Sequence, residues 1–157
     1  MLYASPLDRT METAAVLAKR LCLDVHVRKA FGEVRFGDWT DRDFQSLDQD
    51  PLWQRYNRFR SGTRAPGGAN CSWRCRRAWW RRWKRIRAAQ PGGTIAIVSH
   101  GDAIPSAVLH YAGMPLDFIL RIEISPAPVT VIDVRDWGPK ILLLNGLAPR
   151  GGGRLPV

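Results

Sequence analysis

The amino-acid sequence predicts an α/β fold, a three-layer α/β/α sandwich built around a mostly parallel sheet. Short apolar runs alternate along the chain with segments of helical periodicity. The clearest run, residues 94–99, has four apolar residues in succession, which is typical of a strand buried on both faces in a parallel sheet. With 157 residues, 45% of them hydrophobic, the chain suffices for one packed domain.

The first half of the chain is predicted to begin with a strand end and a helix. Residues 1–4 are apolar, and Ser5 is expected to cap the next helix in a Ser-x-x-Asp box, with Pro6 at its first position. The further elements expected here are a short strand (23–27), a loop (31–40), a helix with a break near Pro51 (41–60) and a loop rich in Gly, Pro and Ser (61–68).

The second half is predicted to continue the alternation of helices and strands. We expect, in order, a long helix (72–90), the buried strand (94–99), a helix (103–112) and two strands (129–134 and 140–144) joined as a hairpin. Residues 1–147 are thus assigned to one domain, and residues 148–157, with three consecutive glycines, to a disordered tail.

The formal net charge of +10 belongs to one part of the chain. No Asp or Glu occurs between Asp50 and Asp102, and that interval holds twelve of the 24 Lys and Arg residues. The remainder carries twelve basic against fourteen acidic residues, a net charge of −2. The basic interval is therefore expected to attract anions.

Cysteine content and hydropathy indicate a cytoplasmic protein without a membrane or metal partner. Three cysteines cannot all pair within the chain, which fits a reducing compartment. Cys71 and Cys75 have no second pair of ligands at the spacing of a zinc site. No apolar stretch is long enough to span a bilayer, and the N-terminus does not read as a secretory signal. We expect no metal and no cofactor.

Two landmarks fall where predicted strands end, which is where α/β folds bind ligands. His100 and Gly101 follow the buried strand and precede a helix, so an imidazole and free backbone N–H groups are expected at one edge of the sheet. Arg9 lies in the first turn of a helix that also follows a strand, where a guanidinium can bind phosphate oxygens. Taken singly, each could instead be a structural histidine or a solvated arginine.

Four segments together resemble the histidine phosphatase superfamily, the phosphoglycerate-mutase-like proteins. Residues 4–14 resemble its Ser-Pro-Leu-x-Arg-x-x-x-Thr-Ala stretch, and residues 33–39 its Glu-x-x-Phe-Gly-x-Trp segment. Residues 66–68 correspond to its Pro-Gly-Gly loop, and residues 98–101, Val-Ser-His-Gly, to its second histidine motif. The four segments occur in the family's order, and the resemblance covers about residues 1–135.

The resemblance implies a phosphomonoester hydrolase that acts through a phosphohistidine intermediate. It assigns phosphate binding to Arg9 and Gly101, the second pocket histidine to His100, and acid/base catalysis to Glu33. A carboxyl beside a bound dianion suits that role because its pKa is raised. The alternative for Glu33 is an exposed loop carboxylate. The short chain leaves little room for mutase insertions, so we expect a hydrolase of a small phosphorylated substrate.

The family's nucleophile motif, Arg-His-Gly, does not occur in this sequence. The three histidines are His26, His100 and His110, and none follows an Arg. The resemblance therefore implies an N-terminally truncated domain that lacks the family's first strand and helix and is inactive by itself. The family's loop Glu and Ser are also replaced, by Ala69 and Asn70. The alternative function is a non-catalytic, anion- or nucleic-acid-binding remnant of the same fold.

The segment 72–90 carries four tryptophans among eight basic residues. Interleaved aromatic and basic side chains can bind single-stranded nucleic acid by stacking. The apolar residues also recur at spacings of three and four, which is typical of an amphipathic helix packed on a sheet. We favour the amphipathic helix, with its arginines facing water, and therefore do not expect a nucleic-acid partner. The sequence leaves the identity of the phosphate ester and the oligomeric state open.

Overall fold

The structure, a computed structural model, describes residues 1–67 and 72–146, with the backbone alone for residues 72–76. Gly68, Ala69 and Asn70 and the predicted tail 148–157 lie outside the described residues.

The central sheet has three parallel strands in the order β2-β1-β3. They are β1 (Leu2–Ala4), β2 (Val25–Val27) and β3 (Ala96–Val98). In the register, Tyr3 lies opposite His26 on one side and Ile97 on the other. All three residues of the middle strand are buried, so the predicted parallel sheet is confirmed at its centre.

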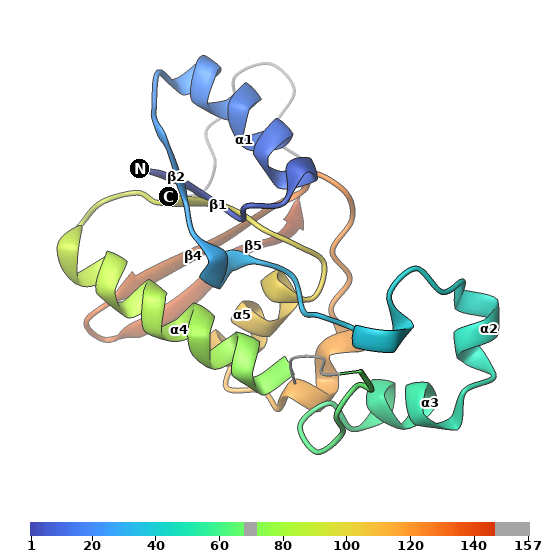
Figure 1. Cartoon of the computed structure of the whole chain (residues 1–157). Helices are drawn as coiled ribbons and strands as arrows, with labels where there is room; N and C mark the ends of the chain where they lie inside the picture. The colour runs from blue at the N-terminus through green and yellow to red at the C-terminus, as the bar shows by residue number, and fades with distance from the viewer. Residues whose placement is uncertain (68–71, 147–157) are drawn as a thin grey trace.

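Helices cover both faces of this sheet (Figure 1). Helix α1 (Asp8–Leu21) packs on one face, and α4 (Ser72–Ala89) and α5 (Ala103–Tyr111) lie on the other. The three-layer α/β/α arrangement predicted from the sequence is therefore confirmed. One core cluster joins the layers, because Ile86 of α4 is buried with Tyr3 and Phe31.

The last two strands form a sheet of their own. Strands β4 (Val129–Arg135) and β5 (Gly138–Gly146) pair antiparallel, as the predicted hairpin requires. Within residues 1–67 and 72–146, no strand pairs with the outer edge of β3. The expectation that this strand is buried on both faces is wrong, since β3 is an edge strand and its three residues are only half-buried.

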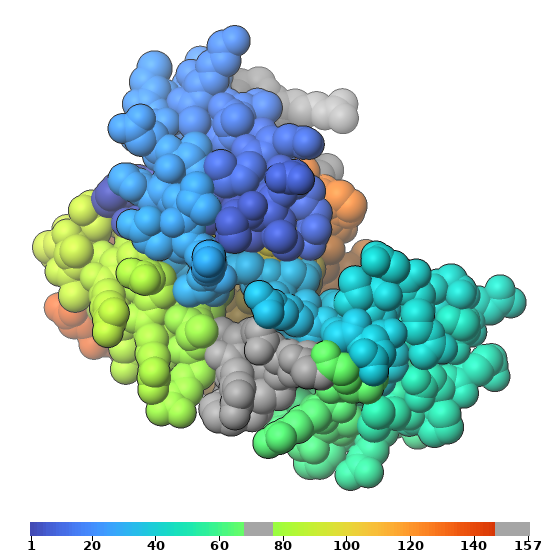
Figure 2. All heavy atoms as spheres, in the orientation of Figure 1, coloured from blue at the N-terminus to red at the C-terminus, as the bar shows by residue number. Residues whose placement is uncertain are grey.

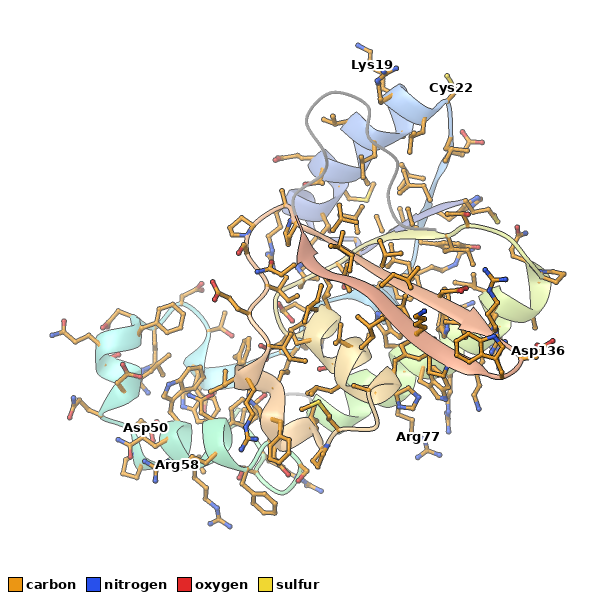
Figure 3. All side chains as sticks on the ribbon, turned by 180° about the vertical axis from the view of Figure 1, so that it is seen from behind. Lys19, Cys22, Asp50, Arg58, Arg77 and Asp136 are labelled. Carbon is orange, nitrogen blue, oxygen red and sulfur yellow. The ribbon has the colours of Figure 1, made fainter. Side chains whose placement is uncertain are left out.

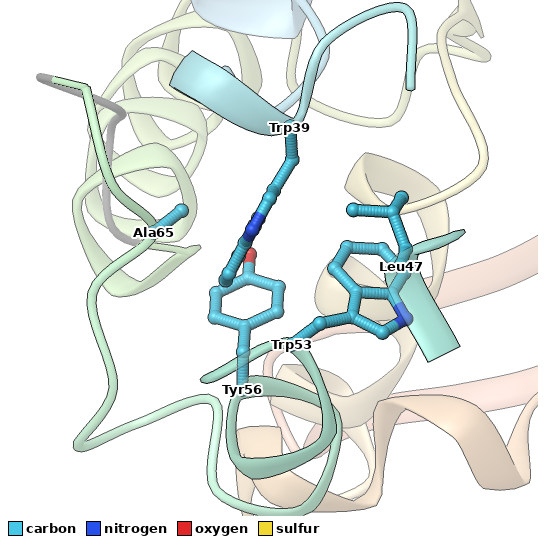
Figure 4. Close-up of a cluster of buried hydrophobic side chains, with 5 residues drawn as sticks. All are labelled: Trp39, Leu47, Trp53, Tyr56 and Ala65. Atoms are coloured by element: carbon cyan, nitrogen blue, oxygen red, sulfur yellow. The ribbon is translucent and has the colours of Figure 1, made fainter. Parts of the chain in front are cut away.

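A small helical unit projects from the sheet toward one side of the molecule (Figures 1 and 2). It contains α2 (Phe44–Asp48) and α3 (Pro51–Arg58), so the predicted break near Pro51 is confirmed. Pro51 begins α3 because a proline fits the first turn, and the Asp50 carboxylate accepts a hydrogen bond from the N–H of Leu52. The unit has its own aromatic core, shown in Figure 4: Trp39, Leu47, Trp53, Tyr56 and Ala65.

The remaining elements of the described residues are three short 3-10 helices, two of which overlap the predicted loop 31–40. They are η1 (Lys29–Phe31), η2 (Gly37–Trp39) and η3 (Leu116–Arg121). Among the helices that the structure describes, none has the length and apolar character needed to cross a membrane.

Candidate phosphate-binding site

Two strand ends meet at the carboxyl edge of the sheet. Ser5 follows β1, and His100 comes two residues after β3. The strands are in register there, because the Ser5 N–H donates to the carbonyl of Val98 over 3.1 Å. The Ser5 hydroxyl then lies 2.7 Å from Nε2 of His100, and both side chains are buried. This hydrogen bond fixes the imidazole at the sheet edge.

The prediction that Ser5 caps the next helix is wrong, and its hydrogen bond to His100 explains why. Helix α1 begins at Asp8, with Leu7 as its N-cap residue, and no side chain caps it. The Ser5 hydroxyl accepts only a long hydrogen bond of 3.4 Å from the N–H of Leu7. It does not cap the helix because its position at the strand end directs it to the imidazole.

Arg9 is placed beside this edge by the first turn of α1. The turn is held to the strand end by Thr10, whose hydroxyl lies within hydrogen-bonding distance of the carbonyls of Ser5, at 3.0 Å, and Leu7, at 2.6 Å. Arg9 itself is exposed. Burial, with a contribution from the positive charge of Arg9, lowers the pKa of His100 from 6.5 to about 4. The imidazole is therefore neutral at neutral pH and can still donate one ring N–H.

Glu33 reaches the same edge from the loop after η1. Its Oε1 accepts a hydrogen bond from the N–H of Val34 at 2.9 Å, and its Oε2 lies 3.5 Å from the N–H of Asp102. Burial is the largest cause that raises the pKa of this carboxyl, and the negative charge of Asp102 adds to it. The backbone hydrogen bonds and the charge of Arg9 oppose the rise. A carboxyl in these surroundings holds its proton to higher pH than an exposed glutamate.

The structure thus brings together the residues that the sequence singled out. Arg9 acts electrostatically on both His100 and Glu33. Gly101 follows His100 and is exposed, with no neighbouring atom within 4 Å of the position that a Cβ would take, so its backbone is open to a ligand. Glu33 is half-buried and bonded to Asp102, which does not fit the alternative of a free loop carboxylate. The catalytic and binding roles of these residues remain predictions.

The sequence analysis missed two parts of this arrangement. The first is the Ser5–His100 hydrogen bond, which was not predicted because Ser5 had been assigned to a helix-capping box. The second is an ion pair between Arg60 and Asp102. Asp102 follows the His-Gly motif directly, which could have drawn attention to it, but Arg60 is one cation within a long basic interval. Its burial could not be read from that composition.

Arg9 and His100 at this edge suit an oxyanion. A guanidinium and a neutral imidazole are both hydrogen-bond donors, and donors of this kind bind phosphate oxygens. No group of three or more His, Cys, Asp or Glu side chains suitable for a metal ion occurs among the described residues.

Comparison with known proteins agrees with this fold. The profile of the histidine phosphatase superfamily (branch 1) matches residues 1–146. Bifunctional protein Rv2228c of Mycobacterium tuberculosis is 34% identical over 146 residues, which cover 90% of this chain and 39% of that protein. The chain therefore spans about two fifths of the length of this curated relative.

Solved structures of phosphatases share the fold at low sequence identity. The α-ribazole phosphatase of Shigella flexneri superimposes with a TM-score of 0.78 at 21% identity, covering 96% of this chain and 76% of its own. The mycobacterial glucosyl-3-phosphoglycerate phosphatase Rv2419c gives 0.81 at 22% identity, with 94% and 78% covered. Together with the profile match, this establishes that the chain belongs to the histidine phosphatase superfamily.

Proposed function

We propose that this chain forms the phosphate-binding body of a phosphomonoester hydrolase that works through a phosphohistidine. The observation that carries the proposal is that Ser5 at the end of β1 bonds His100, while Glu33 approaches the N–H of Asp102 two residues further along. Arg9 lies in the helix turn that Thr10 ties to Ser5. A solved relative from Entamoeba histolytica is a complex with phosphoserine, and a mycobacterial relative is a complex with inorganic phosphate. Both support a small phosphorylated molecule as the substrate class.

In the first step, a nucleophilic histidine attacks phosphorus and the P–O bond to the leaving group breaks. Arg9 and a ring N–H of His100 stabilise charge on the phosphoryl oxygens as the bond breaks. Glu33 donates its proton to the leaving oxygen, and its raised pKa keeps that proton available at higher pH than usual.

In the second step, water attacks the phosphohistidine and the N–P bond breaks. The Glu33 carboxylate accepts a proton from the attacking water, which returns the carboxyl to its starting state. Inorganic phosphate leaves and the nucleophile is regenerated. His100 is not the nucleophile in this scheme, because one ring nitrogen is engaged by the Ser5 hydroxyl and in-line attack needs a second, separate position.

The nucleophile is proposed to come from a strand outside residues 1–157. The sequence contains no Arg-His-Gly motif, and the described part of the chain leaves β3 and the β4–β5 hairpin in separate sheets. A further strand inserted beside β3 would satisfy its unpaired backbone groups and carry a histidine to the edge where His100 lies. By itself, the 157-residue chain is therefore expected to hydrolyse phosphate esters very slowly.

The experiment compares the chain as printed with one extended by the codons that lie in frame before Met1. Hydrolysis of an aryl phosphate is measured for both, with a third protein in which the histidine of an added Arg-His-Gly motif is replaced by glutamine. We expect turnover from the extended chain alone. Equal rates for all three proteins would contradict this assignment of the nucleophile. A stop codon directly before Met1 would favour a non-catalytic remnant.

A second candidate function, anion binding without catalysis, is supported by the outer face of α4. The tryptophans behave as an amphipathic helix predicts, since Trp79, Trp80 and Trp83 are half-buried and Trp79 packs against Phe31. Four of the exposed positions form a basic stripe at spacings of four, three and one residues: Arg77, Arg81, Lys84 and Arg85. Figure 3 shows Arg77 at the rim of the molecule. Like charges at this spacing destabilise a helix, and a bound polyanion would relieve their repulsion.

A matched pair of charge variants tests this candidate with a fluorescent single-stranded oligonucleotide. One variant replaces the four stripe residues by glutamine, and the control replaces four exposed cations elsewhere: Lys19, Arg20, Lys29 and Arg35. Binding through the stripe predicts that the slope of log K against log salt falls by up to about 3 in the first variant only. An equal loss in both would mean diffuse attraction by net charge.

A further inference from the structure

Arg60 is a buried cation at the junction between the helical unit and the part of the fold that contains the central sheet, which is called the sheet domain below. It lies two residues after α3, and its side chain is only 3% exposed. Its Nη1 forms an ion pair with Oδ2 of Asp102, and its Nη2 donates to Oδ1 of Asn57 over 3.2 Å. The guanidinium carbon lies 4.4 Å from the centre of the Tyr56 ring, within cation–π distance.

A buried ion pair adds little to folding stability, because the cost of removing two charges from water offsets most of their attraction. We therefore expect another role for the Arg60–Asp102 pair. The aromatic ring and Asn57 hold the guanidinium in one orientation from the side of the helical unit. The second anchor of the same junction is Asp117 of η3, which accepts hydrogen bonds of 2.8 Å from the N–H and hydroxyl of Ser61. Residues 60 and 61 are thus tied to the sheet domain at two points.

Asp102, which forms the ion pair with Arg60, lies next to the candidate site. Asp102 follows His100 and Gly101 directly, and its N–H is the group that lies 3.5 Å from Oε2 of Glu33. Its carboxylate is also the charged group that acts most strongly on Glu33. One aspartate therefore contacts Arg60 through its side chain and the acid/base carboxyl through its backbone.

We propose that Arg60 is a positioning residue for the reaction, holding Asp102 so that its N–H faces Glu33 and its carboxylate charge is neutralised. The inference rests on the proposed function, for which Glu33 is the acid and base. It links the helical unit to the chemistry, because any movement of α3 against the sheet domain would move Asp102. It also explains the use of arginine, whose planar guanidinium can bond Asp102 and Asn57 while it stacks on Tyr56.

The charges that face Glu33 fix the direction of the expected effect. Arg9 approaches from α1 and lowers the pKa of Glu33, while Asp102 at the start of α5 raises it. His100 is uncharged at neutral pH, since its pKa is about 4. Removal of Arg60 leaves the Asp102 carboxylate unneutralised, so the negative potential at Glu33 increases and its protonated form is favoured further.

The test is a carbon-13 NMR titration of glutamate carboxyls in the full chain, which needs no enzymatic turnover. The chain has three glutamates, and the exposed Glu12 and Glu123 serve as internal references. Arg60→Gln is expected to raise the pKa of Glu33, and Asp102→Asn to lower it. In the double variant the pKa of Glu33 should lie between those of the two single variants, because the two substitutions remove charges of opposite sign.

Two further variants keep the test decisive. Arg58→Gln removes an exposed cation at the end of α3, labelled in Figure 3, and should leave the pKa of Glu33 unchanged. If Arg60→Gln does not fold, Arg60→Lys replaces it and should raise the pKa of Glu33 by a smaller amount. A merely structural role would lower the unfolding temperature without moving the Glu33 titration, and that result would overturn the proposal.

The outcome is separable from that of the proposed function. If Glu33 responds as described but the extended chain hydrolyses nothing, the positioning role stands and the assigned reaction fails. If the extended chain hydrolyses aryl phosphate while Glu33 ignores both Arg60 and Asp102, the reaction stands and the positioning role is refuted.

Discussion

Replacing His100 by glutamine should remove a large part of the acid sensitivity of this protein. The pKa of His100 is about 4 in the folded chain and 6.5 as its ordinary value. Between these values the unfolded chain binds a proton at this position and the folded chain does not. His100 therefore favours unfolding progressively as pH falls from 6.5 toward 4, and has no such effect at pH 7 and above.

The size of the effect follows from the two pKa values. One pKa unit corresponds to about 1.4 kcal/mol, so His100 should destabilise the fold by roughly 2 kcal/mol between pH 7 and pH 5 and by roughly 3 kcal/mol at pH 4. The cause is the burial of the ring beside Ser5 and close to the charge of Arg9. Glutamine retains a polar group for the Ser5 hydroxyl but binds no proton in this range.

Urea denaturation followed by tryptophan fluorescence measures the difference between the two proteins as a function of pH. The stability advantage of His100→Gln over the parent chain should grow as pH falls from 7 to 4. His26→Gln, a substitution on edge strand β2, serves as the control for loss of a histidine. The prediction would be refuted if the stability difference between His100→Gln and the parent stayed constant across this range, or if His26→Gln showed an equal pH dependence. Either result would mean that burial does not lower the pKa of His100 as described.

Four further substitutions, one of them a control, test the surroundings of the site and the core. Glu33→Gln should gain stability relative to the parent as pH rises above 4.5, because a raised pKa stabilises the fold only while the carboxyl is protonated. Trp53→Ala should cost about 3–5 kcal/mol in urea denaturation, and Phe44→Ala, at a side chain 74% exposed, less than about 0.5 kcal/mol. Ser5→Ala should cost about 1–3 kcal/mol in the same assay, since it leaves the buried imidazole without this hydrogen bond.

Each of these has an outcome that would contradict it. A pH-independent effect of Glu33→Gln would mean that the carboxyl is not buried as described. Similar costs for the two aromatic truncations would contradict the separate core shown in Figure 4. A Ser5→Ala effect no larger than that of Thr13→Ala, whose hydroxyl bonds only to a backbone carbonyl of its own helix, would contradict the Ser5–His100 bond.

Local sequence patterns predicted the elements well because each element carries its own signals. Periodicity and Pro51 located the two helices of the projecting unit, and the apolar run located β3. The burial of β3 was misjudged because burial depends on which strands lie beside it, and no pattern within residues 94–99 carries that information. Ser5 was misassigned for a similar reason, since its partner lies 95 residues away.

The positions of Arg9 and His100 at the sheet edge were predictable because a strand end and a motif marked them, and their roles stay predictions. Arg60 was not predictable, because the sequence around it contains many cations of the same kind. Its role depends on Asp102 and Tyr56, and only the packing of α3 against the sheet domain brings Asp102 to it. Long-range pairs between polar residues are set by the fold and leave no local trace.

The most direct measurement of the central claim is a titration of nitrogen-15 histidine-labelled protein with inorganic phosphate. The resonances of His100 should shift on binding, while those of His26 and His110 should not. Arg9→Gln should weaken the binding at least about tenfold, as expected for a charge-assisted contact, and Arg20→Gln on the same helix should leave it unchanged. The claim would be contradicted if phosphate did not shift the His100 resonances, or if Arg9→Gln and Arg20→Gln lowered the phosphate affinity equally. Either result would show that no common phosphate site exists at this edge.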